Sequence, residues 1–324
     1  MSFGARFLRH PERFPERPRG DAWGDRELRL DLPGGPYQLL GLSAGQEDGV
    51  LATFPAARAA ATGDAPIPIQ LLRCTPDEFL PVDVRGWDYG LDFDWAPAAV
   101  RMAGLGLQGR LDWRPDLAGL AGALWTHEDG GERFPGVFEN FLRVLVAYRL
   151  LELGGTVLHS AGVVRDGAAF LFLGRSGAGK TTAARLSLAR GAEVLSDDLN
   201  ALAIGGAWGG ASGGARSGAG VVVVLKLPFT GDLGERRALR PPVPLGGLLR
   251  LVQATADALA PLSRAETLAC LLACAPFVNV DPHRRERLEE VLLALAAAAA
   301  PRAFTLRFSL SGGFWSIINR IKLP

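Results

Sequence analysis

The sequence has 324 residues, a formal net charge of only +1, and a hydrophobic fraction of 48%. This length exceeds the usual size of one domain, so two domains are expected, and the balanced charge argues against binding to nucleic acid or to an anionic membrane surface. Three cysteines are too few for a disulfide framework. The first twenty residues hold no continuous apolar segment, and the longest apolar stretch, near 291–300, is too short to span a bilayer. We therefore expect a soluble, cytoplasmic protein.

The N-terminal part of the chain divides into a short tail and a small domain. Residues 1–22 are polar and interrupted by proline, which predicts a flexible tail, although its phenylalanines could dock elsewhere. From 23 to 130, short apolar runs are separated by glycine and proline, and several alternate with period two, so we expect a small, mostly β domain. Residues 87–95 collect aromatic and aspartate side chains. A strand with a core-facing aromatic side is favoured over a binding role there.

The second domain is expected over 131–312. Residues 138–153 have apolar side chains at helical spacing, and two glycines follow, so they predict an amphipathic helix. Residues 157–164 and 168–173 predict two strands, and Arg165-Asp166-Gly167 predicts the tight turn of a hairpin between them.

A phosphate-binding loop follows this hairpin. Residues Gly174–Thr181 read GRSGAGKT, which matches G-x-x-x-x-G-K-[ST], and residues 181–190 predict the helix that should follow such a loop. Backbone N–H groups at that helix N-terminus can hold an anion. Lys180 should reach the β- and γ-phosphates of a nucleotide, and the Thr181 hydroxyl should ligate Mg²⁺. The expected nucleotide-binding residues are Gly174, Arg175, Ser176, Gly177, Ala178, Gly179, Lys180, Thr181 and Thr182.

The choice of lysine supports this interpretation over that of a glycine-rich turn that matches the pattern by chance. The 35 basic residues include only three lysines, at 180, 226 and 322. A chain that nearly always uses arginine therefore has a lysine at the one position where a compact ammonium group is needed.

Three further side chains complete the candidate site. The segment GAEVLSDD predicts a strand that ends in Asp197 and Asp198, only 17 residues after Lys180, and LNALAI continues it. Successive strand side chains point to opposite faces, so the two aspartates should have different roles, one as general base or metal ligand and the other orienting a neighbour. His159 lies on the strand upstream of the loop. The expected catalytic set is His159, Lys180, Asp197 and Asp198.

The rest of the chain gives weaker signals. Residues 205–220 hold eight glycines and are interpreted as a flexible connection rather than an ordered lid. Residues 221–229 predict a buried strand, in which Lys226 either contacts an anion of the site or marks an exposed strand end.

The C-terminal region completes the expected second domain. We expect 228–234 to be a loop and 240–300 to be largely helical, with a break at 275–282. A last strand is expected over 301–310 and a tail over 313–324. Cys270 and Cys274 lie four residues apart in an apolar helix and are interpreted as small core residues, not metal ligands.

The segment 158–202 resembles the catalytic core of the HPr kinase/phosphorylase family, whose fold is similar to that of phosphoenolpyruvate carboxykinases. The resemblance rests on His159 before the loop, the loop itself, and Asp197-Asp198 after a helix and a strand. It implies an α/β fold with a P-loop and a mixed sheet, preceded here by the smaller β domain. It also implies an ATP- and Mg²⁺-dependent kinase, with Asp197 preferred as the base that deprotonates a seryl hydroxyl. Thr181 and Asp198 are the candidate metal ligands, and which of Asp197 and Asp198 is base and which is ligand stays open at this level.

The chain departs from that family in two places. The family's second signature, which serves the reverse phosphorolysis, is not recognisable, so phosphorylase activity is not expected. The first 130 residues do not resemble the family's regulatory domain. The chain looks like a divergent relative of the kind encoded beside genes for peptide natural products, so the expected acceptor is a Ser or Thr of a small protein or peptide, such as a precursor peptide. Family members often form oligomers, and a homo-oligomer is consistent with the resemblance.

Two other functions stay open at the level of the sequence. The same core could phosphorylate the hydroxyl of a small metabolite, which a deep, closed pocket over Asp197 would favour. It could also belong to a nucleotide-binding regulatory protein with little turnover. Nothing in the sequence identifies the acceptor or distinguishes ATP from another phosphoryl donor.

Overall fold

The computed structural model describes residues 2–15, 19–55, 65–82, 89–114, 119–205, 220–229, 231–233 and 239–321. The chain folds as two compact units, Met1–Val146 (unit 1) and Ala147–Pro324 (unit 2). Both units combine β-sheet with helices, so the chain is mixed α/β. The division falls later than the boundary expected at 130/131, within a long helix whose first part packs in unit 1. In the part of the chain described, no helix is both long and apolar enough to cross a membrane.

Unit 1 is built on a sheet, as the alternating apolar runs predict, and the sheet is mixed. Its strands are β1 (Arg26–Leu30), β2 (Tyr37–Leu42), β3 (Ile67–Arg73), β4 (Leu91–Ala96), β5 (Ala99–Gly104), β6 (Leu107–Arg114) and β7 (Gly119–Thr126). They lie in the order β1-β2-β3-β7-β6-β5-β4, and only the pairs β2–β3 and β3–β7 are parallel. The crossover from β2 to β3 includes helix α1 (Ala44–Thr53), which begins with a capping box of Ser43 and Gln46.

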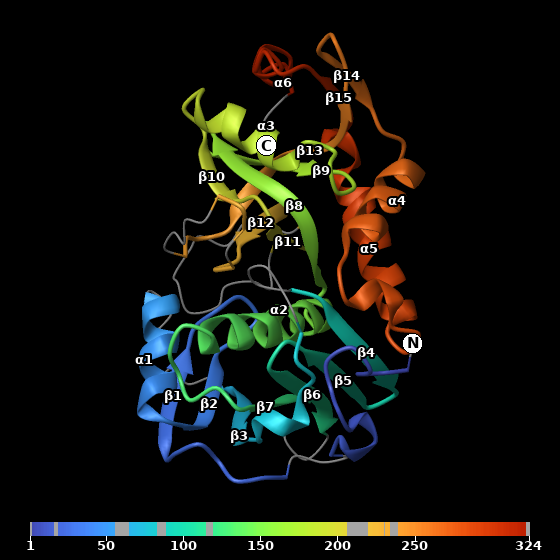
Figure 1. Cartoon of the computed structure of the whole chain (residues 1–324). Coiled ribbons are helices and arrows are strands. Elements are labelled where there is room, and N and C mark those ends of the chain that lie inside the picture. Colours follow the sequence, from blue (N-terminus) through green and yellow to red (C-terminus); the bar gives the residue numbers. More distant parts are fainter. Residues whose placement is uncertain are drawn as a thin grey trace. The chain divides into compact units, whose positions relative to one another are not determined.

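The long helix α2 (Phe134–Glu152) covers one face of this sheet (Figure 1). The ring of Phe141 lies so close to β7 that a Cβ on Gly122 would be 2.9 Å from it. The predicted helix is confirmed, and Phe138 and Phe141 are fully buried. Its amphipathic character is not, because all of residues 137–148 are buried, including Glu139, Asn140 and Arg143, so the helix has no polar face in water there.

The N-terminal segment packs against unit 1, so the prediction of a flexible tail is wrong for its described part. Phe7, Leu8 and Phe14 are at most 5% exposed and form a cluster with side chains of β3 and β7. Leu8 also pairs with Phe79 as an isolated β-bridge. The physical reason is the transfer of large apolar side chains out of water, which outweighs the polar composition of the rest of the segment.

The aromatic segment at 87–95 contributes an edge strand. Residues 87 and 88 lie outside the described part of the chain. In β4, the rings of Phe93 and Trp95 stack at a centroid distance of 5.7 Å. Both side chains are only half-buried, because β4 is the last strand of the sheet, so the expected core-facing side is only partly formed.

Unit 2 contains the strands β8 (Gly155–Arg165), β9 (Ala168–Leu173), β10 (Glu193–Ser196), β11 (Leu199–Ile204), β12 (Val222–Lys226), β13 (Val243–Gln253), β14 (Ala258–Pro261) and β15 (Ala303–Phe308). Five of them close a ring, in which β8 pairs with β9, β9 with β13, β13 with β12, β12 with β11, and β11 again with β8. The hairpin β8–β9 has the predicted turn, with Asp166 at φ 51° and Gly167 at φ 75°.

The prediction of a largely helical region over 240–300 is wrong for its first third. Residues 243–253 form β13, which lies parallel to both β9 and β15. A strand buried between two neighbours reads as a continuous apolar run, and such a run cannot be told from a buried helix by its pattern. The remainder is helical as expected, with α4 (Arg264–Cys274) and α5 (Arg285–Ala299) side by side (Figure 1).

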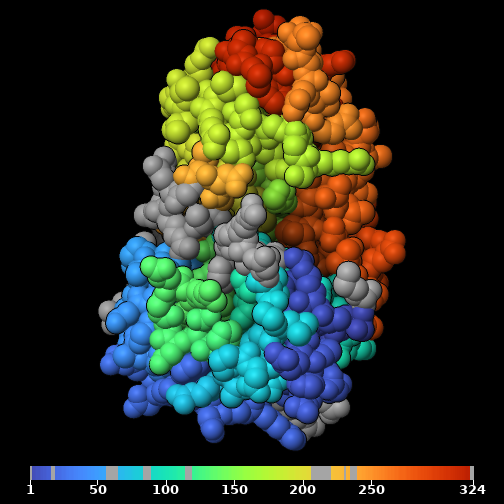
Figure 2. All heavy atoms as spheres, viewed as in Figure 1, coloured from blue at the N-terminus to red at the C-terminus, as the bar shows by residue number. Residues whose placement is uncertain are grey.

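The C-terminal segment is also part of the core rather than a tail. Phe314, Trp315 and Ile318, at the short helix α6 (Trp315–Ile318), are at most 3% exposed and belong to the main apolar cluster of unit 2. The indole Nε1 of Trp315 donates a hydrogen bond of 3.0 Å to Ser187 Oγ in helix α3 (Lys180–Leu188). In Figure 2 the red C-terminal residues accordingly lie directly on the yellow-green ones of this unit.

Candidate functional site

The loop Gly174–Lys180 connects the buried strand β9 to helix α3, which is the predicted context. Gly179 is the N-cap of α3 in the left-handed region at φ 98°, and a Cβ there would lie 2.6 Å from the ring of Phe308. Only glycine meets both conditions. Arg175, Ser176 and Gly177 are exposed, and Thr181 and Thr182 are partly exposed in the first turn of the helix. The loop and the first turn of the helix are therefore accessible to a ligand.

Lys180 is the best-buried charged side chain of this loop, with a relative exposure of 7%. Its Nζ donates hydrogen bonds to the carbonyl oxygens of Gly174 at 3.1 Å and Arg175 at 3.3 Å, so the loop folds around the ammonium group. Burial lowers the pKa of Lys180, and the nearby Asp198 carboxylate partly offsets this shift. The ammonium group is thus positioned beneath the loop with an acidic side chain nearby.

His159, on strand β8, forms an ion pair with Asp198. Asp198 lies between β10 and β11, which both pair with β8, and its carbonyl accepts a hydrogen bond of 2.9 Å from the backbone N–H of Ser160. This contact places Asp198 beside His159, and Nδ1 of the ring is 3.1 Å from Asp198 Oδ1. The side chain of His159 is 47% exposed and that of Asp198 is 20% exposed, so solutes can reach the pair.

Asp197 points elsewhere, as expected for neighbouring residues of an extended segment. It is 6% exposed, and its Oδ1 accepts a hydrogen bond of 3.3 Å from the backbone N–H of Leu233. Its Oδ2 is buried without a hydrogen-bond partner among the described residues. The structure therefore groups His159, Lys180 and Asp198, and it places Asp197 against the segment 231–233.

Three polar residues that the sequence reasoning missed hold the Asp pair in place. Ser196 Oγ accepts hydrogen bonds from the backbone N–H groups of Asp198 at 3.2 Å and Leu199 at 3.3 Å. Asn200 Nδ2 donates to the carbonyl of Ser160 at 2.9 Å and to its hydroxyl at 3.1 Å. These residues are buried, and their only sequence signal is that polar side chains flank the aspartates within an otherwise apolar segment.

Two other side chains contact the loop without having been predicted to do so. Gln253 Nε2, at the end of β13, donates a hydrogen bond of 2.9 Å to the carbonyl of Gly177. Cys274, interpreted as a small core residue, is buried near the backbone N–H of Gly174 and near Lys180. Burial raises the pKa of its thiol, so Cys274 stays protonated.

Two expectations concern the chain beyond the Asp pair. Lys226 is 4% exposed and lies opposite Asn200 in the β11–β12 ladder, which excludes the alternative of an exposed strand end. The predicted glycine-rich connection at 205–220 lies almost entirely outside the described residues. Residues 228, 229 and 231–233 have no helix or strand, as predicted for this loop.

Comparison with models of protein families gives a match over the second half of the chain. The model of the family described as SynChlorMet cassette protein ScmC matches residues 138–323, which include every residue of the candidate site. No curated protein matches the sequence.

Proposed function

This chain belongs to the family of the SynChlorMet cassette protein ScmC, and we propose that it is an ATP- and Mg²⁺-dependent kinase for a hydroxyl group. The acceptor in this proposal is a Ser or Thr side chain of a small protein or peptide. The order of strand, loop, helix and acidic pair supports a fold of the HPr kinase type for unit 2, as the sequence resemblance implies.

The observation that carries the proposal is the His159–Asp198 pair close to Lys180. Phosphoryl transfer requires a cradle for the phosphates, a metal ion, and a group that accepts the proton of the attacking hydroxyl. Asp198 lies 3.1 Å from His159 Nδ1 and acts electrostatically on the Lys180 ammonium group. A carboxylate in this position can take up a proton next to the terminal phosphate.

The residues present fit a bound nucleotide and its metal ion. The exposed loop with its helix N-terminus suits a triphosphate, and Lys180 would exchange its bonds to loop carbonyls for bonds to phosphate oxygens. The Thr181 hydroxyl would ligate Mg²⁺, which usually takes few protein ligands and keeps several waters. When bound, Mg²⁺-ATP supplies the γ-phosphoryl group.

We assign the base role to Asp198 rather than to Asp197, the residue preferred from the sequence resemblance. In the proposed reaction the acceptor oxygen forms a bond to the γ-phosphorus, the bond to the β-γ bridging oxygen breaks, and ADP leaves. Asp198 accepts the hydroxyl proton, and His159 orients its carboxylate. The Asp197 carboxylate accepts a hydrogen bond from the backbone N–H of Leu233 and would hold the segment 231–233 beside the site. The role of metal ligand proposed for Asp198 from the sequence is incompatible with this assignment.

The exposure of His159 favours a large acceptor. A kinase for a small metabolite usually encloses its acceptor in a pocket. Here the side chain of His159 is 47% exposed, so the proposed base lies beside an open surface. This openness supports a protein or peptide acceptor over a small metabolite. The third possibility, nucleotide binding without turnover, is decided by the transfer experiment that follows.

We expect purified protein to transfer label from [γ-³²P]ATP to Ser- or Thr-containing peptides only when Mg²⁺ is present. Addition of EDTA should abolish transfer, and excess Mg²⁺ should restore it. Thr181→Ala should raise the Mg²⁺ concentration for half-maximal transfer, because a ligand of the ion is lost. Thr182→Ala removes a neighbouring hydroxyl that has no assigned role toward the metal ion, so it should leave that Mg²⁺ concentration unchanged. Bound ATP that is never transferred or hydrolysed under any of these conditions would contradict the proposal.

A further inference from the structure

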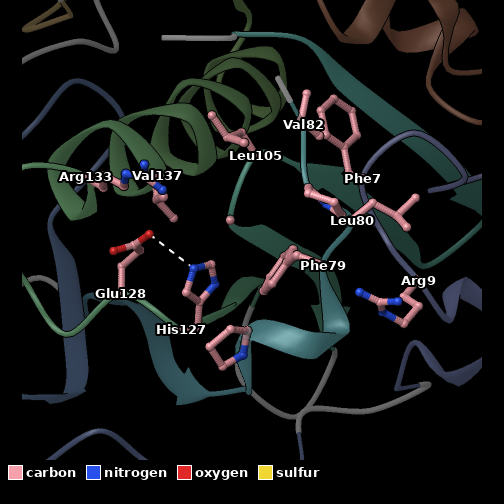
Figure 3. Close-up of a pocket in the computed structure, with 13 residues that line it drawn as sticks. Phe7, Arg9, Phe79, Leu80, Val82, Leu105, His127, Glu128, Arg133 and Val137 are labelled. Carbon is pink, nitrogen blue, oxygen red and sulfur yellow. Dashed lines mark ion pairs between the residues drawn. The ribbon is translucent and has the colours of Figure 1, made fainter. Parts of the chain in front are cut away.

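Unit 1 contains a pocket that has no part in the proposed transfer site. Its volume is about 430 Å³, which is within the range of ligand-binding cavities of ~300–1,000 Å³. All of its lining residues belong to unit 1. Apolar and aromatic side chains form much of its lining (Figure 3), namely Phe7, Phe79, Leu80, Val82, Leu105 and Val137.

Charged side chains lie on two sides of these apolar walls. His127 Nε2 is 3.2 Å from Glu128 Oε1, and in Figure 3 this pair and Arg133 lie on one side of the pocket, with Arg9 on the other. Arg9 Nε donates a hydrogen bond of 2.9 Å to the carbonyl of Asp77, which fixes the direction of its guanidinium group. The residues that line the pocket include two arginines and one carboxylate, Glu128, so the charged groups that face it are mainly cationic.

We propose that this pocket binds a peptide segment in which acidic side chains flank one large apolar side chain. The apolar walls suit an aromatic or branched side chain, because such rings bury a large area and pack well edge-to-face against Phe7 and Phe79. Arginines are the preferred partners of carboxylates. Their placement on opposite sides matches an extended segment with carboxylates on both sides of the apolar residue better than it matches a compact acid.

This inference rests on the proposed function, because it makes the pocket a docking site for the peptide acceptor. The docked segment would be distinct from the phosphorylated hydroxyl, since the pocket contains none of His159, Lys180 and Asp198. The sequence around the hydroxyl would then contribute little to acceptor choice. A separate acidic and apolar segment of the acceptor would determine it.

The test uses the full chain and fluorescein-labelled peptides with a Glu-Trp-Glu core, and fluorescence anisotropy gives the Kd. We expect the Kd to rise at least about tenfold when Trp is replaced by Ala or when both Glu are replaced by Gln. Peptides that bind equally well in all three forms would overturn the proposal. Displacement of the peptide by indole-3-acetate at an equal concentration would also overturn it, because a small acid would then suffice.

Matched variants locate the binding site. Leu105 is partly exposed at the pocket, so Leu105→Trp should fill the pocket without unfolding the protein and raise the Kd by at least about tenfold. Arg133→Glu reverses an exposed charge and should also raise the Kd. Arg26→Ala, on an exposed residue outside the pocket, should leave it unchanged. Equal affinity of all variants would overturn the proposal.

The two proposals can fail separately. The binding experiment needs no nucleotide, so peptide binding that depends on Leu105 and Arg133 supports the pocket even if no phosphate is ever transferred. Conversely, transfer to Ser-containing peptides at a KM that neither variant changes would overturn the docking site and leave the kinase proposal intact.

Discussion

Asp198→Asn should slow phosphoryl transfer by roughly 10²–10⁴-fold, the usual effect of losing a general base. Asparagine has nearly the same shape but cannot accept the proton of the attacking hydroxyl. The neighbouring groups make this carboxylate the best placed for the role, since His159 Nδ1 is 3.1 Å from it and Lys180 lies nearby. The measurement is the transfer rate at saturating ATP, with the Kd for ATP determined in parallel and expected to change little.

Asp197→Asn is the matched control for this variant. The Asp197 carboxylate accepts a hydrogen bond from the backbone N–H of Leu233, and the oxygen of an asparagine amide can still accept it. A smaller loss is therefore expected than for Asp198→Asn. A larger loss for Asp197→Asn would return the base role to Asp197, and equal loss in both would mean that the two carboxylates act together.

Lys180→Met should reduce the transfer rate by roughly 10²–10³-fold and weaken ATP binding, because a preorganised charge next to the phosphates is lost. Methionine keeps the length and volume of the aliphatic stem while it removes the ammonium group. Methionine leaves the carbonyl oxygens of Gly174 and Arg175 without their hydrogen bonds from Nζ, so the thermal stability of the variant is measured in parallel. Equilibrium ATP binding and the transfer rate together separate the two effects.

Lys180→Arg tests whether charge alone is sufficient. The guanidinium group is larger and planar, and the space between the carbonyls of Gly174 and Arg175 holds a compact ammonium. We expect this variant to resemble Lys180→Met rather than the wild type. Normal ATP binding and transfer in both variants would show that the loop does not hold the phosphates.

The loop and its neighbouring elements could be predicted because their signals are local. The turn at Asp166 and Gly167, the buried run of β9 and the glycine pattern each depend on a few adjacent residues. The pattern for 243–253 was ambiguous because a strand with neighbours on both sides and a buried helix have similar apolar runs. Its parallel neighbours, β9 and β15, are distant in sequence and decide the structure.

The two chain ends were mispredicted for a related reason. Phe7 and Phe14 lie in a polar, proline-containing segment, and Phe314 and Trp315 follow a glycine pair near the end of the chain. The polar composition of the N-terminal segment favours disorder. The C-terminal segment is rich in large apolar side chains, and a tail was predicted there only because it follows the last expected strand. Their burial depends on apolar surfaces that exist only once the two units have folded, and no local pattern reports those surfaces.

The residues of the candidate site could be predicted from the sequence, but the contacts that these residues make could not. The spacing from Lys180 to the aspartates placed both near the loop, and alternation along a strand predicted that they diverge. Which one faces His159 depends on the interruption between β10 and β11, where Ser196 bonds to the backbone of Asp198. The support from Asn200 and Gln253 likewise becomes visible only in three dimensions.

The central claim is tested most directly by a crystal structure of the protein with Mg²⁺ and a non-hydrolysable ATP analogue. The account predicts the terminal phosphate within hydrogen-bonding distance of Lys180 Nζ, about 3 Å, with the Asp198 carboxylate facing the phosphorus from the side open to an acceptor. A nucleotide bound away from the loop, or one whose terminal phosphate is directed away from Asp198, would contradict it.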